Sequence, residues 1–386
     1  MTDSFIPEIG GKQLVVHYLS TQLVRHGCKS AVLTNKIKRR HKYNFSYLVY
    51  VYPIKLKFLR ILTNLFYIAY IGKFSKINII HAHRTYPAGY CAVLIGRLFR
   101  IPTVITPHGD DILIVPKIKY GINLIKRLKG KSVYALKNAS AIIALNEGMK
   151  NECIKLGVHS NKIHTIPIGI NFDDLNNQHS LFQKTKSGKN LIVVGRHRPV
   201  KGYEVLLKAM EIVVKKDPDI KCKIVGKGTD KLLSLIRDLN LKDNIIIHGE
   251  IIKSIEKGMP VKLKTFYQNS DIYISSSLSE SFSLTTLEAM AMGLPIISTD
   301  TVGIRGLIEN NIDGLIVPVN NPVMMAKQIL CLTSDYSLQK RLGEKARLKA
   351  KKVQYSWQDI SLKHILLYKK LIVLNEIRTN YLFSKE

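Results

Sequence analysis

Two glutamates stand eight residues apart in a segment whose pattern predicts the start of a helix. The segment spans residues 279–295, with Glu280 just before the helix and Glu288 about one turn inside it, and a Gly and a Pro mark its end. The backbone N–H groups of residues 281–285 would form the helix N-terminus, a favourable site for an anion. A phosphate there would leave both carboxylates free to accept hydroxyl groups, Glu288 from a ribose and Glu280 from a sugar. Acids at a helix start can also favour its dipole without any ligand.

Two cations stand five residues apart on a loop that follows a predicted strand. The strand ends at Gly195, and Arg196 and Lys201 come before the next predicted helix. Such a loop lies at the carboxyl end of a strand, where α/β folds bind ligands. Arg196 can grip an oxyanion with its planar fork, and Lys201 can act as a point charge. A solvated basic loop is the alternative in a chain this basic.

Histidines mark the ends of two predicted strands in the first half. His81 and His83 form a His-x-His pair, and His108 follows the predicted strand 103–106. No Cys or third His has a spacing that would complete a metal site around the pair, so packed or strand-end histidines are the better interpretation. The glycine that follows His108 favours a position in a cleft over one in the core.

Short apolar, β-branched runs alternate with helix-length segments in both halves of the chain. Parallel strands that are buried on both faces have this composition. Because the alternation occurs twice and a polar stretch, 173–190, separates the halves, we predict two doubly wound α/β domains with a cleft between them. The predicted strands are Ser30–Thr34, Ile77–Ala82, Thr103–Thr106, Ala141–Leu145, Lys162–Ile166, Leu191–Val194, Ile220–Val225, Asn244–His248, Asp271–Ile274, Pro295–Ser298 and Leu315–Val317.

A pair of glycines, Gly10 and Gly11, opens the first predicted helix, which Gly27 ends. Without Cβ atoms, these two residues could let backbone N–H groups approach a phosphate. Only residues 1–6 precede this glycine loop and its Pro-Glu-Ile lead, too few for a full strand and turn. We therefore expect the first strand to be short or missing, through a late assigned start or a truncation that would reduce activity.

The order of these blocks resembles glycosyltransferase family 4 over about residues 7 to 370. The motifs that carry this resemblance are the Glu-x7-Glu block at 279–295 and the Gly-Arg-x4-Lys-Gly block at 195–202. Weaker matches are Asn146-Glu147, Lys162–Asn171, Gly226-Lys227-Gly228 and Ser356-Trp357. The resemblance implies the GT-B fold, two Rossmann-like domains facing each other. The expected domains are an acceptor-binding domain at 1–170, a nucleotide-sugar-binding domain at 171–353 and a C-terminal helix at 354–386 that crosses back to the first.

Residue roles also follow from the resemblance. The expected catalytic residues are His108, Glu280, Arg196 and Lys201. The expected donor-binding residues are Gly10, Gly11, Gly195, Ser281, Phe282, Ser283, Leu284 and Glu288. Arg196, Lys201 and the helix N-terminus near Ser283 would stabilise the leaving diphosphate. One departure is Gly306, which stands where relatives usually carry a glutamate, and this puts the donor pocket in doubt.

The function that the resemblance implies is transfer of a hexose-type sugar from a nucleoside-diphosphate sugar to a hydroxyl, with retention of configuration. The acceptor would be a polysaccharide or a lipid-linked sugar in cell-surface glycan biosynthesis. No cofactor and no metal are expected, because the proline and the setting of Asp217-Pro218-Asp219 predict a turn and not a metal motif. The alternatives are an inactive donor-binding protein, a sugar-nucleotide epimerase of the same fold, and a nucleic-acid binder suggested by charge alone.

The charge implies an anionic partner. Lys and Arg number 59 against 28 Asp and Glu, a net charge of +31. Two segments, Ile54–Lys76 and Lys117–Lys131, interleave cations with apolar and aromatic residues, as helices in an acidic membrane interface do. Amphipathic helices packed on the sheet are the alternative. We find no nucleic-acid-binding module.

Localisation is predicted from the cysteines and from hydropathy. The five cysteines are scattered without metal-ligand spacing, which indicates buried thiols in a reducing cytosol. We see no signal peptide and no run of 18 uncharged apolar residues, so no transmembrane span is predicted. The expected location is the cytoplasm, with peripheral association with the inner face of the membrane as a further hypothesis.

Overall fold

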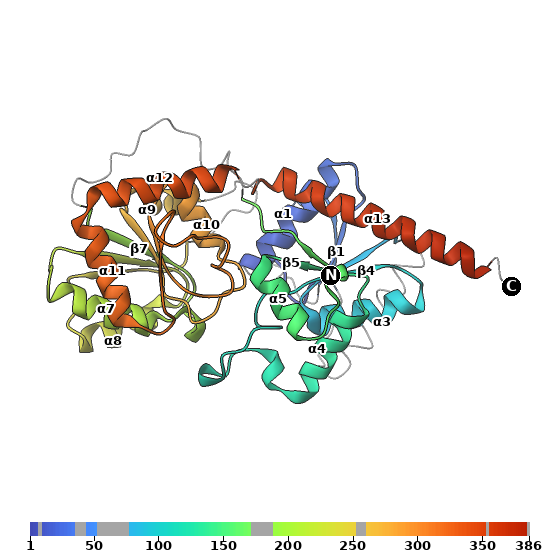
Figure 1. Cartoon of the computed structure of the whole chain (residues 1–386), viewed down its shortest axis with the longest axis horizontal. Helices are drawn as coiled ribbons and strands as arrows, with labels where there is room; N and C mark the ends of the chain where they lie inside the picture. The colour runs from blue at the N-terminus through green and yellow to red at the C-terminus, as the bar shows by residue number, and fades with distance from the viewer. Residues whose placement is uncertain are drawn as a thin grey trace. The chain divides into compact units, whose positions relative to one another are not determined.

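The computed structural model describes residues 1–6, 10–34, 44–51, 77–170, 188–251, 260–352 and 355–383. The chain divides into two compact units. Unit 1 comprises Met1–Gly169 and Trp357–Glu386, and unit 2 comprises Ile170–Ser356. Each unit holds parallel strands covered by helices (Figure 1). The prediction of two parallel-sheet α/β domains is confirmed.

Unit 2 contains one six-stranded sheet in the order β12-β11-β10-β7-β8-β9, and every neighbouring pair is parallel. Its strands are β7 (Asn190–Val194), β8 (Lys221–Val225), β9 (Ile245–His248), β10 (Ile272–Ser275), β11 (Ile296–Thr299) and β12 (Leu315–Val317). The first strand, β7, lies between β8 and β10, so the chain extends the sheet first on one side and then on the other. This is the order of a doubly wound Rossmann fold, which binds ligands where the direction switches.

Helices cover both faces of the unit 2 sheet. They are α7 (Tyr203–Val214), α8 (Leu233–Asp238), α9 (Val261–Gln268), α10 (Leu284–Ala291), α11 (Pro322–Ser334) and α12 (Tyr336–Lys352). In Figure 1, α7 and α11 pack together on one face, and α10 and α12 pack together on the other. The sequence of α7 places Leu206, Met210 and Val213 on one face, where all three are buried. Each such burial is worth about 1.5–3 kcal/mol.

Unit 1 holds a two-stranded sheet, β1-β2, and a four-stranded sheet, β3-β4-β5-β6, all parallel. The strands are β1 (Ala31–Thr34), β2 (Leu48–Val51), β3 (Ile80–His83), β4 (Thr103–Thr106), β5 (Ala141–Ala144) and β6 (Ile163–Thr165). The chain start connects the two sheets, because Thr2 N donates to Leu33 O at 3.0 Å while His83 N donates to Met1 O at 2.9 Å. Thr2 forms only an isolated bridge with His83, so the expectation that no full first strand forms is confirmed.

The main helices of unit 1 are α1 (Gly11–Arg25), α3 (Tyr90–Leu98), α4 (Lys126–Asn138), α5 (Glu147–Lys155) and α13 (Trp357–Phe383). As predicted, α1 ends before Gly27, whose φ of +79° suits a glycine after a helix C-terminus. Helix α13 packs on α1, with the rings of Trp357 and Tyr18 stacked 5.5 Å apart. The C-terminal segment therefore folds as part of unit 1.

All eleven predicted strand runs overlap a strand of the structure, but β2 was missed. No residue of β2 is fully buried, and Leu48 and Val51 at its two ends are exposed. It therefore does not resemble a strand that is buried on both faces. The prediction of buried thiols was wrong for two cysteines: Cys28 is half-buried and Cys331 is exposed. Neither residue lies in a strand, whereas the buried Cys222 lies within β8.

The segment Lys117–Lys131 is not one helix, contrary to expectation. It contains two short 3-10 turns, Pro116–Ile118 and Ile122–Leu124, before α4 begins. The chain reverses between them because Lys119 and Gly121 adopt positive φ angles of 51° and 108°. The other basic segment, Ile54–Lys76, lies outside the described residues. Within the described part of the chain, no helix is both long and apolar enough to cross a membrane.

Candidate functional site

Two loops of unit 2 are tied together where the sheet direction switches. Ser276 Oγ, after β10, donates to Lys201 O at 2.9 Å, and Leu278 N donates to Val200 O at 2.8 Å. Gly202 permits this approach, because its φ is +62° and a Cβ there would lie 2.1 Å from Ser276 O. The loops that follow β7 and β10 are therefore held as one structure, and both carry predicted site residues.

Lys201 and Glu280 are brought together by this arrangement. Lys201 Nζ forms an ion pair with Glu280 Oε1, and Ser277 Oγ donates to the same oxygen at 3.0 Å. The main chain of Glu280 is also fixed, since its carbonyl accepts from Gly303 N at 2.7 Å. The side chains are 27% and 13% exposed, so the pair is largely removed from water. The cation that binds this carboxylate comes from 79 positions away in the sequence, and the predicted role of Glu280 toward a sugar stays a prediction.

The loop at Gly195 packs against the neighbouring strand end. Tyr203 Oη donates to Gly195 O at 2.6 Å, and His197 N donates to Lys227 O at 2.8 Å. A Cβ at Gly226 would lie 1.9 Å from Gly195 O, so only glycine fits there. Arg196 is half-buried on the same loop. The predicted blocks at 195–202 and 226–228 thus form one surface at the carboxyl edge of the sheet.

Helix α10 begins without a side-chain cap. Ser283 is its N-cap residue, but the Ser283 side chain bonds none of the first-turn N–H groups, and Ser283 Oγ instead accepts from Thr286 Oγ1 at 2.7 Å. Phe282 is buried beside the Tyr355 ring, 6.4 Å away, and fixes the approach to the helix. The start at Leu284 agrees with the predicted helix. An uncapped N-terminus presents donors to an anion.

Glu288 lies within α10, as predicted, and is largely buried. Only 5% of it is exposed, and its Oε2 accepts a hydrogen bond from Tyr267 Oη of α9 at 2.9 Å. Burial and the nearby carboxylate raise the pKa of Tyr267 well above its usual range. The predicted role of Glu288 toward a ribose stays a prediction.

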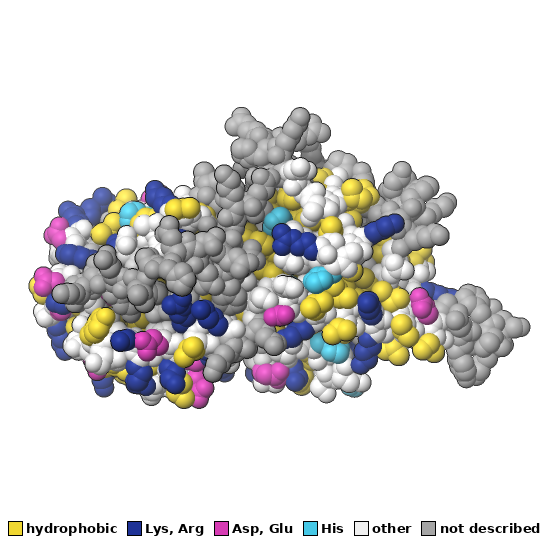
Figure 2. Space-filling view, turned by 90° about the horizontal axis from the view of Figure 1, so that it is seen from above, with side chains coloured by type: hydrophobic (Ala, Val, Ile, Leu, Met, Phe, Trp, Pro, Cys, Tyr) yellow, Lys and Arg dark blue, Asp and Glu magenta, His cyan; other side chains and the backbone are white. Residues whose placement is uncertain are grey.

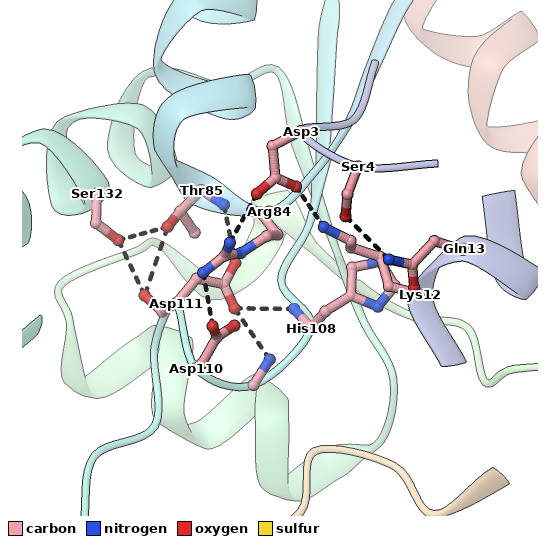
Figure 3. A network of polar contacts seen from close by, with 11 residues as sticks. Asp3, Ser4, Lys12, Gln13, Arg84, Thr85, His108, Asp110, Asp111 and Ser132 are labelled. Atoms are coloured by element: carbon pink, nitrogen blue, oxygen red, sulfur yellow. Dashed lines mark hydrogen bonds and ion pairs between the residues drawn. The ribbon is translucent and has the colours of Figure 1, made fainter. Parts of the chain in front are cut away.

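In unit 1, His108 (Figure 3) lies just after the end of β4, and its ring lies next to that of His83. His108 Nε2 and His83 Nδ1 are 3.0 Å apart and share a hydrogen bond. Burial lowers the pKa of His108 to about 3, so its imidazole is neutral at physiological pH. A neutral ring can donate at one nitrogen and accept at the other.

Asp111 holds the loop that carries His108. Its Oδ1 accepts from His108 N and from Gly109 N, each at 2.9 Å, and its Oδ2 accepts from Thr85 N at 2.8 Å (Figure 3). Ser132 Oγ from α4 reaches the Asp111 carbonyl at 3.1 Å. The carboxyl is fully buried, and desolvation raises its pKa. One side chain thus joins the ends of β3 and β4.

A chain of charges surrounds the start of α1. Asp3 pairs with Lys12 and with Arg84, and Arg84 Nη2 donates to Asp110 at 2.7 Å (Figure 3). Arg84 has a φ of +99°, which non-glycine residues rarely adopt and which often marks functional sites. Gly10 is the N-cap residue of α1, and a Cβ at Gly11 would meet no atom within 4 Å. Among the described residues, Gly11 therefore has no neighbour at the place where a side chain would begin.

Comparison with known proteins gives two family matches. Residues 9–174 match the family described as Glycosyltransferase Family 4, and residues 176–349 match Glycosyl transferases group 1. The chain belongs to glycosyltransferase family 4. It is accordingly a transferase, as the order of its sequence blocks predicted.

The relatives of this family 4 chain include enzymes with different acceptors in their names. It is 26% identical to an N-acetyl-alpha-D-glucosaminyl L-malate synthase of Bacillus anthracis over 88% of this chain and 89% of that one. It is 28% identical to the Escherichia coli UDP-Gal:alpha-D-GlcNAc-diphosphoundecaprenol alpha-1,3-galactosyltransferase over 68% of each. A sucrose-phosphate synthase of Thermosynechococcus elongatus is a similar solved structure, with a TM-score of 0.77, 19% identity and coverage of 97% of this chain and 95% of that one. Anabaena HepE has a TM-score of 0.77 and 16% identity, with coverage of 96% of this chain and 98% of that one. Both support the GT-B fold.

Within each unit, the predicted residues of the family 4 site lie close together. Arg196, Lys201, Glu280 and the start of α10 share the switch point of unit 2, while His108 lies at the strand ends of unit 1. Their roles stay predictions. Gly306, the departure from the family pattern, has a φ of +89° and open space where a Cβ would stand.

Sequence reasoning missed the residues that position the site. Asp111 was given no role, although an Asp shortly after a strand and a Gly is a signal for a side chain that binds nearby backbone. Ser277 and Tyr267 gave no comparable signal, because the contacts of Tyr267 with Glu288 and of Ser277 with Glu280 depend on how the elements pack.

Replacing Asp111 by Asn tests the loop that it holds. The amide would present an N–H group to at least one of three backbone donors, so we expect a loss of about 1–3 kcal/mol in the free energy of unfolding. Transfer should fall while donor affinity, which depends on unit 2, stays unchanged. Asp110→Asn is the control: its side chain is 39% exposed, and it should cost under about 1 kcal/mol. Equal unfolding free energies for the two variants in urea titrations would contradict the role of Asp111.

The histidines of unit 1 predict acid sensitivity. Burial lowers the pKa of His108 to about 3 and of His364 to about 4, and the pKa of His83 lies well below its usual range. The unfolded chain binds these protons from about pH 6.5 downward, so stability should be complete above that pH and fall toward pH 4, by about 1.4 kcal/mol per pH unit for each histidine.

Urea unfolding of unit 1 between pH 7 and 4 measures this dependence. His364→Leu should make the dependence shallower, whereas the same measurement on His159→Gln, at an exposed position, should match wild type. A stability that does not change between pH 7 and 4.5 would show that the folded state accommodates protonated rings.

Proposed function

We propose that this family 4 chain transfers a hexose-type sugar from a nucleoside diphosphate to a hydroxyl group, with retention of configuration. One observation carries the proposal. The loop with the cation Lys201 and the loop with the carboxylate Glu280 are joined beside the start of α10. The leaving diphosphate gains negative charge, which Arg196, Lys201 and the helix N-terminus would stabilise. Because these groups supply the positive charge, we expect no metal requirement. Anabaena HepE, solved with UDP and with UDP-glucose, supports a nucleotide-sugar donor.

His108 and Glu280 would orient the transferred sugar. A neutral imidazole and a carboxylate are suitable partners for uncharged hydroxyls, because the first can donate or accept and the second accepts. The hydrogen bond to His83 and the bonds from Asp111 would keep the imidazole in one orientation. Preorganised groups of this kind cost no rearrangement during the reaction.

For the acceptor, we propose a polysaccharide or a lipid-linked sugar at an anionic membrane surface. The excess of positive charge is concentrated in unit 1, which has 31 Lys and Arg against 9 Asp and Glu, while unit 2 has 28 against 19. On the face drawn in Figure 2, Lys and Arg lie among exposed hydrophobic side chains. The name of the E. coli relative includes a diphosphoundecaprenol-linked sugar, which is a lipid-linked acceptor.

The part of unit 1 best suited to a membrane is residues 114–129, here called the basic loop surface. Three apolar side chains are exposed on it: Ile114 at 49%, Leu124 at 40% and Ile125 at 57%. Between residues 112 and 146 the chain has seven Lys and Arg and no acidic residue. Figure 1 shows this teal segment extending away from the sheet of its unit. Apolar side chains among cations favour an anionic interface.

Calorimetric titration with UDP, GDP and ADP tests the donor site. We expect saturable binding of one nucleotide, weakened at least about tenfold by Lys201→Ala, because a charge-assisted contact to phosphate is lost. Lys208→Ala removes an exposed cation of α7 and should bind like wild type. If the folded protein binds none of the three, the inactive-protein alternative takes the place of this proposal.

Vesicle flotation tests the basic loop surface. The wild type should float with phosphatidylglycerol vesicles and not with phosphatidylcholine vesicles, and binding should weaken as salt rises. The double substitution Leu124→Glu with Ile125→Glu should abolish flotation, since it removes apolar contact and adds negative charge. The control Val323→Glu alters an equally exposed apolar residue of unit 2. Retained binding by the double variant, or no binding by the wild type, would count against this surface.

A further inference from the structure

The cation and the carboxylate of the unit 2 loops form an ion pair. Lys201 Nζ binds Glu280 Oε1, and the pair is fixed on both sides: Ser276 Oγ holds the Lys201 carbonyl, and Ser277 Oγ reaches the same Glu280 oxygen. The aliphatic part of Lys201 runs along Gly195, where a Cβ would come within 3.6 Å of its Cε. Lys201 therefore faces the carboxylate as part of a built loop and not as a freely moving surface cation.

A diphosphate that takes Lys201 must change this pairing. Lysine is a point charge, and a phosphate that binds it competes with the carboxylate for the same ammonium group. The main chain of Glu280 is held, because Gly303 N donates to its carbonyl at 2.7 Å, and Ser277 Oγ holds the carboxylate near Lys201. The carboxylate would then stand next to a doubly charged ligand in a site that is largely shielded from water, where like charges repel strongly.

The two ligands of the reaction leave Glu280 in different situations. A nucleotide sugar brings hydroxyl groups that can donate to the carboxylate and replace the bonds lost from Lys201. A nucleoside diphosphate, the product, brings no such donor. It would leave a carboxylate beside its own negative charge and without the cation, which is costly for a buried group.

We propose that Glu280 discriminates the nucleotide-sugar donor from the nucleoside-diphosphate product, by competing with the product for Lys201 and by binding the sugar of the donor. This inference rests on the proposed function and adds a role in product release. The carboxylate then acts both before and after transfer. It orients the sugar of the donor, and it lowers the affinity for the nucleoside-diphosphate product.

The test is a comparison of dissociation constants for a nucleoside diphosphate and its glucose conjugate, chosen from the UDP, GDP and ADP pairs by wild-type binding. In Glu280→Gln, the product should bind at least tenfold more tightly than in wild type, while the donor should gain less or lose affinity. The ratio of product to donor dissociation constants should therefore fall, and by at least tenfold where the donor gains no affinity. Product inhibition of transfer should strengthen in parallel.

Two further variants separate charge from loop structure. Ser277→Ala removes a hydrogen bond from Glu280 without changing charge and should leave the ratio near its wild-type value. Glu204→Gln removes an exposed acidic charge of α7 and should also leave it unchanged. Weaker or unchanged product binding by Glu280→Gln, or the same effect from Ser277→Ala, would overturn this inference and leave the donor site intact. Absence of nucleotide binding in the wild type would instead refute the proposed function.

Discussion

Parallel strand packing is the constraint on which the rest of this structure depends. In such a sheet all strands end at one edge, so each loop that follows a strand meets its neighbours there. In unit 2, β7 lies next to β10 although 77 residues separate their ends, and this alone brings the loop with Lys201 to the loop with Glu280. Gly202 and Gly226 then set how closely the loops approach, because any side chain at either position would collide with backbone.

The two units use this edge differently. Unit 2 places fixed charges and an uncapped helix start at the ends of its strands, which suits a ligand with its own charge. Unit 1 places neutral imidazoles at the corresponding ends of β3 and β4, since burial keeps His83 and His108 unprotonated. The ion pairs of Asp3, Arg84 and Lys12 lie near the ring of His108. Uncharged hydrogen-bonding groups suit hydroxyls, which the proposed transfer needs for its sugar and its acceptor.

Much of this was predictable from sequence, because strands buried on both faces carry an apolar signature that does not depend on their partners. The same reasoning placed Glu280 before α10 and Glu288 inside it, and both positions are correct. It could not foresee β2, whose exposed residues lack that signature, or the occupied state of the two carboxylates. Their partners, Lys201 and Tyr267, come from other elements, and no local pattern encodes a contact between elements.

The occupied carboxylates change how the family motif should be understood. A motif shows which groups can meet a ligand, whereas the structure shows which protein groups they also bind, and a ligand must compete with those bonds. The pair of Glu288 and Tyr267 is buried, so a ligand reaches it less readily. The pair of Lys201 and Glu280 is more exposed, so a diphosphate can compete for it. A charged ligand of this site should therefore compete first for Lys201.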